Sequence, residues 1–154
     1  MSALLLVGCG VSNEKNEVQS VKEEQVVNAS DEIVIPFPDG VTPIGEGTVK
    51  VITPDGTSED GNIPTVFIKK DTLIQQVELE LTNFQNDKET FVFVDNIFED
   101  KHHVTSKTQT TVELKQKTLE MGQHTVTAVQ FENNDPTGKV INFVQAQFEN
   151  KPAL

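Results

Sequence analysis

The side chains best suited to acid–base or metal chemistry gather around two adjacent histidines, His102 and His103. Asp95 and Asp100 precede them and Ser106 follows, which supplies the residue types of a Ser/His/Asp site. Neighbouring residues of a strand point to opposite faces, so the two imidazoles do not readily bind one ion. No nucleophile elbow accompanies them. Exposed loop histidines are the favoured interpretation, and an enzyme with a His/Asp site near 100–103 stays open as an alternative.

Carboxylates and other oxygen ligands are concentrated in residues 55–62, Asp-Gly-Thr-Ser-Glu-Asp-Gly-Asn. Calcium prefers such ligands, but their spacing differs from that of an EF-hand loop, and Asp-Gly commonly forms a turn. Glu78 and Glu80 are expected on the solvent face of a strand, where they favour solubility over glycosidase chemistry. No phosphate-binding glycine loop is present. We therefore expect a turn at 55–62, no metal and no cofactor.

A threonine-rich stretch has the character of a binding surface. It runs Thr105-Ser106-Lys107-Thr108-Gln109-Thr110-Thr111. On an edge strand, the hydroxyl groups of Thr105, Ser106, Thr108 and Thr110 can hydrogen-bond a glycan, and the strand itself can pair with a partner strand. A solvated edge of high β-propensity explains the same residues. Both interpretations stay open.

Cys9 is the only cysteine, so the chain forms no internal disulfide. The apolar run from Ser2 to Gly8 is far shorter than the roughly 20 residues that span a bilayer, and it fits the end of a signal-peptide hydrophobic region. Leu6-Val7-Gly8-Cys9 resembles the bacterial lipobox: an aliphatic residue, one intervening residue, a small residue and Cys. This resemblance implies that diacylglycerol is attached to the Cys9 sulfur and that a peptidase cuts between Gly8 and Cys9.

The residues after Cys9 are polar and have little apolar surface to bury. Residues 10–30 are rich in Ser, Asn, Glu, Lys and Gln. This composition predicts a disordered tether over 9–30, after a signal-peptide remnant at 1–8. Together with the lipobox resemblance, it predicts a protein on the extracytoplasmic face of a cell membrane, with membrane lipid as its partner through Cys9.

Charge and composition limit the classes of molecule that the chain is expected to bind. The net charge is −12, and Arg, Trp and Tyr are absent. An acidic chain is a poor ligand for nucleic acid and for anionic headgroups. The missing side chains are those that most often anchor tight interfaces, so we expect a weak or polar contact with an unidentified surface protein or glycan. The use of Lys alone as the basic residue, with abundant Asn and Gln, favours an AT-rich Gram-positive host.

Residues 31–154 read as strands separated by turns. Val77, Leu79 and Leu81 alternate with Glu78 and Glu80, a two-residue period that predicts a strand with one buried face. Residues 91–94, Phe-Val-Phe-Val, are apolar on both faces, as in a central strand. The remaining candidate strands are 33–37, 47–53, 63–69, 102–106, 111–116, 123–131 and 140–148.

The last candidate strand changes phase, because Ile141 and Phe143 share one face while Val144, Ala146 and Phe148 share the other. A bulge near Phe143 and Val144 is expected to bring both sets into one core. Residues 31–70 exceed what a minimal sandwich needs. We expect them to add two N-terminal strands and a hairpin to a core sandwich over 71–150, with a small separate subdomain as the alternative.

A further resemblance lies in Leu119-Glu120-Met121-Gly122-Gln123-His124 and the alternating residues that follow. This stretch resembles the corner between strands E and F of immunoglobulin-like and fibronectin type III domains. The resemblance, over 73–150, implies that Leu119 plugs the core, that Gly122 takes the turn and that Val126 and Ala128 face inward. His124 stands where such domains often have Tyr, whose hydroxyl group bonds back to the corner, and an imidazole could make a similar bond.

The fold class is therefore all-β: an Ig-like antiparallel β-sandwich of about 7–9 strands, preceded by a disordered N-terminal tether. For function, we predict a non-catalytic binding or accessory module on a bacterial envelope. A structural subunit that joins an envelope assembly through an edge strand is one alternative. The His/Asp enzyme is the other.

Overall fold

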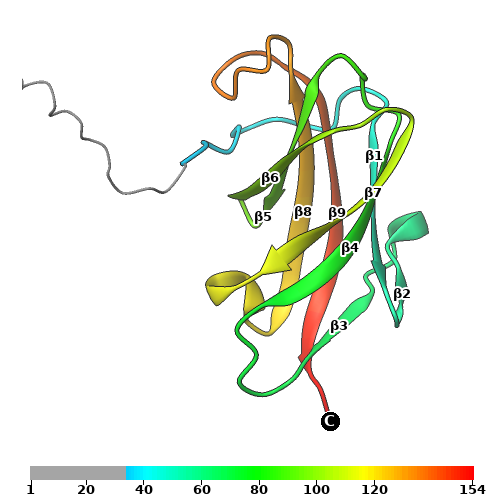
Figure 1. The fold of residues 1–154 in the computed structure, drawn as a ribbon, viewed down its shortest axis with the longest axis vertical. Coiled ribbons are helices and arrows are strands. Elements are labelled where there is room, and N and C mark those ends of the chain that lie inside the picture. The colour runs from blue at the N-terminus through cyan, green and yellow to red at the C-terminus, as the bar shows by residue number, and fades with distance from the viewer. Residues whose placement is uncertain (1–33) are drawn as a thin grey trace, which may run out of the picture. The chain divides into compact units, whose positions relative to one another are not determined.

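Two β-sheets stacked face to face form residues 34–154, the part of the chain that the computed structural model describes (Figure 1). One sheet has the strand order β2-β1-β4-β7, and the other has the order β3-β9-β8-β5-β6. The elements are β1 (Thr48–Thr53), β2 (Gly56–Thr57), η4 (Glu59–Gly61), β3 (Thr65–Ile68), β4 (Gln75–Thr82), β5 (Glu89–Val94), β6 (Ile97–His103), β7 (Lys107–Leu114), η5 (Gln116–Leu119), β8 (Gly122–Phe131) and β9 (Val140–Pro152). The predicted all-β sandwich is confirmed.

The strand order is that of an immunoglobulin-like sandwich. β1, β4 and β7 share one sheet, as strands A, B and E do, while β5, β8 and β9 share the other, as strands C, F and G do. After β1 the chain changes sheets, so that β3 pairs with β9. That pairing is parallel, whereas the other strand pairs in residues 34–154 are antiparallel.

The main core lies between the sheets. Val77, Leu79 and Leu81 of β4 are buried there, whereas Glu78 between them is exposed, which confirms the predicted alternation. Each fully buried aliphatic side chain contributes about 1.5–3 kcal/mol. The buried members of this core are Val49, Val51, Val66, Ile68, Val77, Leu79, Leu81, Phe84, Val92, Val94, Val104, Val112, Leu114, Val126, Ala128 and Phe148.

A second, smaller core covers the outer face of the five-stranded sheet. Its buried members are Phe91, Phe93, Val129, Phe131 and Phe143. The segment Ile35–Ile44, here called the N-terminal strap, lies over them, with Phe37 packed edge-on against Phe93 at 5.2 Å between ring centroids. β5 is therefore buried on both faces, as its Phe-Val-Phe-Val sequence predicts.

The strap corrects one expectation. Its apolar alternation predicts a strand over 33–37, but the described residues of the strap form no strand, and only Ile44 makes a bridge, to Phe143. Pro36, Pro38 and Pro43 have no N–H group to donate to a ladder. The apolar side chains of this segment therefore cover a sheet and do not extend one.

The predicted bulge near Phe143 and Val144 is wrong. The β8–β9 ladder pairs these two residues with Val129 and Ala128 without interruption, and its irregularity lies at Gln130/Phe131. Phe143 and Val144 point to opposite faces, so they pack in different cores. The change of phase in the sequence thus reports two cores, one on each side of the sheet.

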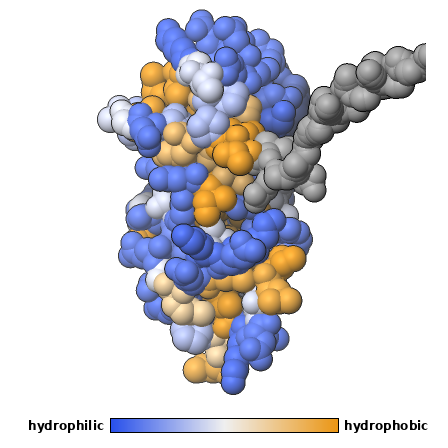
Figure 2. All heavy atoms as spheres, turned by 90° about the vertical axis from the view of Figure 1, so that its left-hand side faces the viewer, coloured by the Kyte–Doolittle hydropathy of each residue, from blue (hydrophilic) through white to orange (hydrophobic). Residues whose placement is uncertain are grey.

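The surface outside these cores is mixed. On the face that Figure 2 shows, hydrophobic residues lie in small patches separated by hydrophilic ones. Broad apolar patches mark tight interfaces, and this face does not present one. Among residues 34–154, no helix has the length and apolar character needed to cross a membrane.

Candidate functional site

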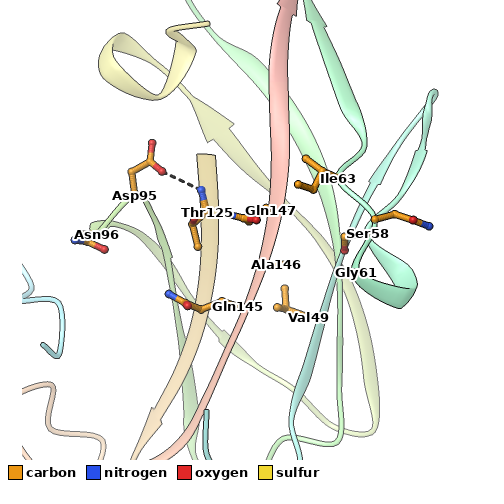
Figure 3. A pocket seen from close by; sticks show the side chains of 11 residues that line it. Val49, Ser58, Gly61, Ile63, Asp95, Asn96, Thr125, Gln145, Ala146 and Gln147 are labelled. Atoms are coloured by element: carbon orange, nitrogen blue, oxygen red, sulfur yellow. Dashed lines mark hydrogen bonds between the residues drawn. The ribbon is translucent and has the colours of Figure 1, made fainter. Parts of the chain in front are cut away.

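A cleft of about 730 Å³ lies along strand β9 (Figure 3). Gln145, Ala146 and Gln147 of β9 run through it. The remaining lining residues come from both sides of that strand: Val49, Ser58, Gly61, Asn62, Ile63, Asp95, Asn96 and Thr125. The cleft thus joins segments that are far apart in the sequence.

The β9 edge facing this cleft lacks a neighbouring strand for part of its length. Phe143 exchanges main-chain hydrogen bonds with Ile44, and β3 pairs with β9 from Glu149 onward. Gln145 and Gln147 lie between these two contacts. The N–H and C=O groups of successive strand residues point to alternate sides. Because Phe143 and Glu149 direct these groups away from β8, Gln145 and Gln147 do so as well. Within residues 34–154, these groups make no main-chain hydrogen bond.

The two walls of the cleft differ in chemistry. Thr125, Gln145 and Gln147 present hydroxyl and amide groups on the outer face of the five-stranded sheet, and Asn96 extends this polar wall. On the other side lie the exposed Ile63 and the buried Val49, with the polar Ser58 next to them. The cleft is thus lined mostly by polar groups, with aliphatic side chains on one side.

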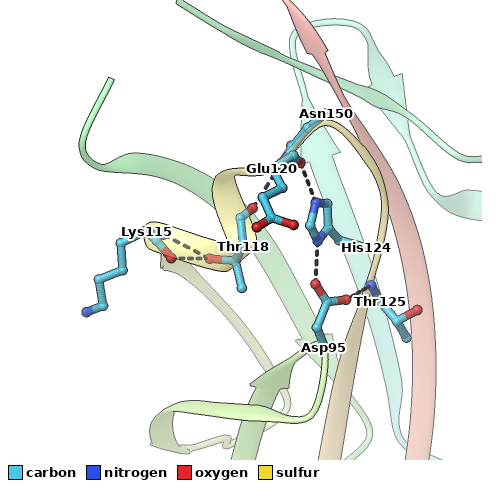
Figure 4. A network of polar contacts seen from close by, with 7 residues as sticks. All are labelled: Asp95, Lys115, Thr118, Glu120, His124, Thr125 and Asn150. Carbon is cyan, nitrogen blue, oxygen red and sulfur yellow. Dashed lines mark hydrogen bonds and ion pairs between the residues drawn. The ribbon is translucent and has the colours of Figure 1, made fainter. Parts of the chain in front are cut away.

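Asp95 is the one titratable side chain among the lining residues of the cleft. Both oxygens of its carboxylate have a partner. Oδ1 accepts a hydrogen bond from the Thr125 N–H at 2.9 Å, and Oδ2 contacts His124 Nδ1 (Figure 4). The Asp95 N–H in turn donates to the Thr125 carbonyl at 2.9 Å. This carboxylate therefore fixes the β5–β6 turn to β8.

His124 is buried, with 6% of its surface exposed, and both ring nitrogens are bound. Nε2 lies 2.6 Å from the carbonyl oxygen of Glu120, which can only accept, so Nε2 carries a hydrogen. Nδ1 contacts the Asp95 carboxylate. Phe148 stacks on the ring at 5.4 Å between centroids. In a catalytic triad one nitrogen must face a nucleophile, and here a main-chain carbonyl takes that place.

The other corner residues support this arrangement. Leu119 is partly buried against the main core, and Gly122 has φ +111°, a conformation that other residues rarely adopt. The Asn150 side-chain amide donates to the carbonyls of Thr118 and Glu120, at 2.9 and 3.0 Å. The contact of His124 Nε2 with the Glu120 carbonyl is a bond back to the corner main chain, such as an imidazole at this position could make.

The histidine pair lies on β6, an edge strand. His102 is half-buried, with Nε2 at 4.0 Å from the Asp100 carboxylate and without a hydrogen-bond partner in the described part of the chain. His103 is exposed on the opposite face of the strand. The two imidazoles thus do not converge, and neither they nor Asp100 line the cleft. Ser106 is exposed in the turn before β7.

Glu99, next to these residues, has the one strongly shifted titration in residues 34–154. It lies at a bulge of β6, where Asp100 pairs with Val92 and Phe98 pairs with Phe93. Burial raises the pKa of Glu99 to about 7, opposed by Lys115. This group belongs to the sandwich edge and does not line the cleft.

The threonine-rich stretch divides between a turn and a strand. Thr105 and Ser106 are exposed in the β6–β7 turn. Thr108 and Thr110 lie on β7, an edge strand, on the same side as the buried Val112. Thr108 and Thr110 are therefore half-buried at the margin of the sandwich. The exposed face of β7 carries Lys107 and Gln109 instead.

Two of the three carboxylates in 55–62, those of Asp55 and Glu59, have protein partners. Asp55 Oδ2 accepts the Thr65 N–H at 3.1 Å, and Glu59 pairs with Lys50 at 3.1 Å. Lys50 also pairs with Glu80 at 2.9 Å, and this contact lowers the pKa of Glu80. No cluster of three His, Cys, Asp or Glu side chains suited to a metal ion occurs in residues 34–154. Gly8 and Cys9 lie outside the described residues.

Sequence reasoning missed the cleft. Asn62, Asn96, Gln145 and Gln147 are ordinary turn and strand residues in the sequence, and no motif marks them. The cleft arises because β3 reaches β9 only at Glu149. A pattern of side chains does not reveal where two strands stop pairing.

No family model matches the sequence, and no curated protein matches it. Among solved structures, a fibronectin(III)-like module of CbhA from Clostridium thermocellum is similar over 70% of this chain and 100% of the module, with 12% sequence identity and a TM-score of 0.39. The immunoglobulin-like assignment of this chain therefore rests on its own strand order.

Proposed function

We propose that this chain is a non-catalytic binding module, held on the outer face of a bacterial membrane by lipid on Cys9, with the β9 cleft as its binding site. The observation that carries the binding role is the cleft itself: about 730 Å³, open to solvent, and lined by amide, hydroxyl and aliphatic groups. Pockets of this size are the usual sites of ligand binding.

The non-catalytic part of the proposal is supported by the state of the titratable groups. General acid–base catalysis needs a proton donor or acceptor within hydrogen-bond reach of the substrate. In the cleft that group could only be Asp95, and both of its oxygens already accept hydrogen bonds. His124, its partner, is fully bonded as well.

The sequence supports the proposed attachment to the outer face of a membrane. Leu6-Val7-Gly8-Cys9 has the residue types of a lipobox, and polar residues 10–30 follow it. A tether of this kind lets an anchored module search the surface next to the membrane, where anchoring raises the effective concentration of a weak binder.

Fatty-acid labelling tests the anchor. The gene, with its upstream region, is expressed in a Gram-positive host that is fed labelled palmitate. We expect label on the wild-type chain and none on Cys9→Ser, while the matched variant Ser12→Ala keeps the label. Protease added to intact cells should digest the domain and spare a cytoplasmic marker. An unlabelled wild-type chain that is protected from protease would contradict the proposal.

A hydrolase panel tests the non-catalytic role. We expect the purified wild-type chain to show no turnover of ester, peptide or glycoside substrates. A turnover that disappears in His103→Ala, with the fold intact by circular dichroism, would establish the enzyme alternative in its place.

A further inference from the structure

We infer that the cleft takes an extended peptide, which adds as a short strand to the free edge of β9 at Gln145–Gln147. This inference rests on the proposed binding role of the cleft and names the chemistry of its ligand. Strand addition to an open sheet edge is a common mode of peptide recognition, in which main-chain hydrogen bonds supply affinity and alternate side chains supply specificity.

The main chain of β9 is ready for such a partner. Phe143 and Glu149 already donate their N–H groups to the carbonyls of Ile44 and Pro64, at 2.8 and 2.9 Å. Gln145 and Gln147 have the same orientation and lie between them, with the cleft in front of their N–H and C=O groups. A peptide at this position would hydrogen-bond Gln145 and Gln147, between the existing bonds of Phe143 to Ile44 and of Glu149 to Pro64.

The length of the open edge limits the ligand. Six residue steps separate Phe143 from Glu149, or about 20 Å of strand. Ile44 and Pro64 occupy the two ends of this span. The space between them therefore fits an extended segment of about four residues.

The two walls fix which side chains the peptide carries. A residue opposite Ala146 points to the same side as Ala146, toward Val49 and Ile63, because directly paired residues share a face. Residues opposite Gln145 and Gln147 point toward the polar wall of Thr125. The fitting sequence thus alternates polar, apolar, polar, with an aliphatic side chain at the centre.

Charge favours a neutral or basic peptide. The lining residues include Asp95 and no lysine, and the chain carries a net charge of −12. Like charges repel an acidic peptide from such a site. A glycan fits less well, because the lining residues include no aromatic ring on which a sugar could stack.

A peptide titration of the whole 154-residue chain, with Cys9→Ser to prevent lipidation, tests the inference. The ligand is acetyl-Thr-Val-Thr-Lys-amide, and the control is the same peptide with both threonine nitrogens methylated. Amide NMR should show shifts and slowed hydrogen exchange at Gln145 and Gln147. The methylated peptide keeps every side chain but loses its donors to β9, so it should bind about tenfold or more weakly.

Two variants at one position separate the main chain from the side chain. Gln147→Pro removes the N–H that faces the cleft, and an edge position tolerates proline because no internal hydrogen bond is lost. Gln147→Ala removes the amide side chain and keeps the N–H. We expect Gln147→Pro to bind the peptide at least tenfold more weakly than Gln147→Ala, with both variants folded by NMR.

Several results would overturn strand addition. These are no shift from the plain peptide at millimolar concentration, equal binding of the methylated peptide, or shifts confined to β6 or β7. Shifts at the cleft from chitin or cellulose oligosaccharides, with none from the peptide, would identify a glycan site. A labelled, membrane-bound chain that ignores the peptide refutes the inference alone, whereas an unanchored chain that binds it refutes only the membrane address.

Discussion

His124 and Asp95, 29 residues apart in the sequence, form a partly buried contact that joins the η5–β8 corner to the β5–β6 turn. The histidine donates on its other side to the Glu120 carbonyl, and the aspartate accepts from the Thr125 N–H. The pair thus ties two ends of strands within one sheet and places Asp95 at the margin of the cleft. It is a structural contact beside the cleft.

Removal of this histidine should cost stability. His124→Phe keeps the ring against Phe148 but leaves the Asp95 carboxylate without its main donor. Because a charge that loses its partner is destabilising and Asp95 is partly exposed, we expect a loss of about 2–3 kcal/mol. Urea unfolding followed by circular dichroism measures it.

The control for this change is His103→Phe, at an exposed position of β6. We expect that variant to stay within about 0.5 kcal/mol of wild type. A double-mutant cycle with Asp95→Asn should give a coupling of about 1–2 kcal/mol. Equal costs for the two histidine variants would mean that the buried contact contributes nothing.

The N-terminal strap should stabilise the sandwich through Phe37. Phe37→Ala removes the ring that packs against Phe93 and Phe143, which we expect to cost about 2 kcal/mol, since the side chain is only partly buried. Hydrogen exchange of β5 and β8 amides should become faster. Phe67→Ala is the matched control, because Phe67 is 52% exposed, and its cost should be below about 1 kcal/mol.

A polar network at the β8–β9 ladder predicts a third effect. Gln130 is fully buried, accepts from Gln85 N and Asn142 Nδ2, and donates to the Gln85 carbonyl. Gln130→Leu leaves these groups unpaired, with an expected loss of about 3–5 kcal/mol. Gln123→Leu changes an exposed glutamine of the same strand and should be nearly neutral. Thermal unfolding compares the two, and equal melting temperatures would contradict this role.

Glu99 should make stability depend on pH. Its pKa in the folded protein is about 7, above the usual value of 4.5, so the folded state binds more protons between these values. Stability therefore falls as pH rises from 4.5 to 7. Glu99→Gln should remove this fall, which we expect to be about 1 kcal/mol after allowance for solvent screening. Urea midpoints at pH 5 and pH 8 measure it. Glu78→Gln, at an exposed position, should keep the wild-type slope.

The sequence was sufficient to predict the sandwich because local patterns carry that information. Val77, Leu79 and Leu81 mark one buried face, and residues 91–94 mark a strand buried on both. The same patterns do not say which surface covers the second face of β5. The apolar alternation of the strap predicted a strand. The structure shows that the strap instead covers the outer face of the sheet, where Phe37 packs on Phe93 and Phe143.

The cleft could not be predicted for a related reason. Within residues 34–154, a stretch of β9 has no neighbouring strand because β3 pairs only from Glu149 and Ile44 forms a bridge only to Phe143. Both limits are set by the packing of segments more than 80 residues apart in the chain. Sequence periodicity reports which face of a strand is buried, but it does not report which edge is paired.

The mass of the mature N-terminus tests the central claim, an anchored module outside the membrane, most directly. The gene is expressed with its upstream region in a Gram-positive host, and the N-terminal peptide of the purified protein is analysed by mass spectrometry. We expect residues 1–8 to be absent and Cys9 to carry diacylglycerol. A cytoplasmic chain that retains Met1 and an unmodified Cys9 would contradict the anchor and the membrane address together.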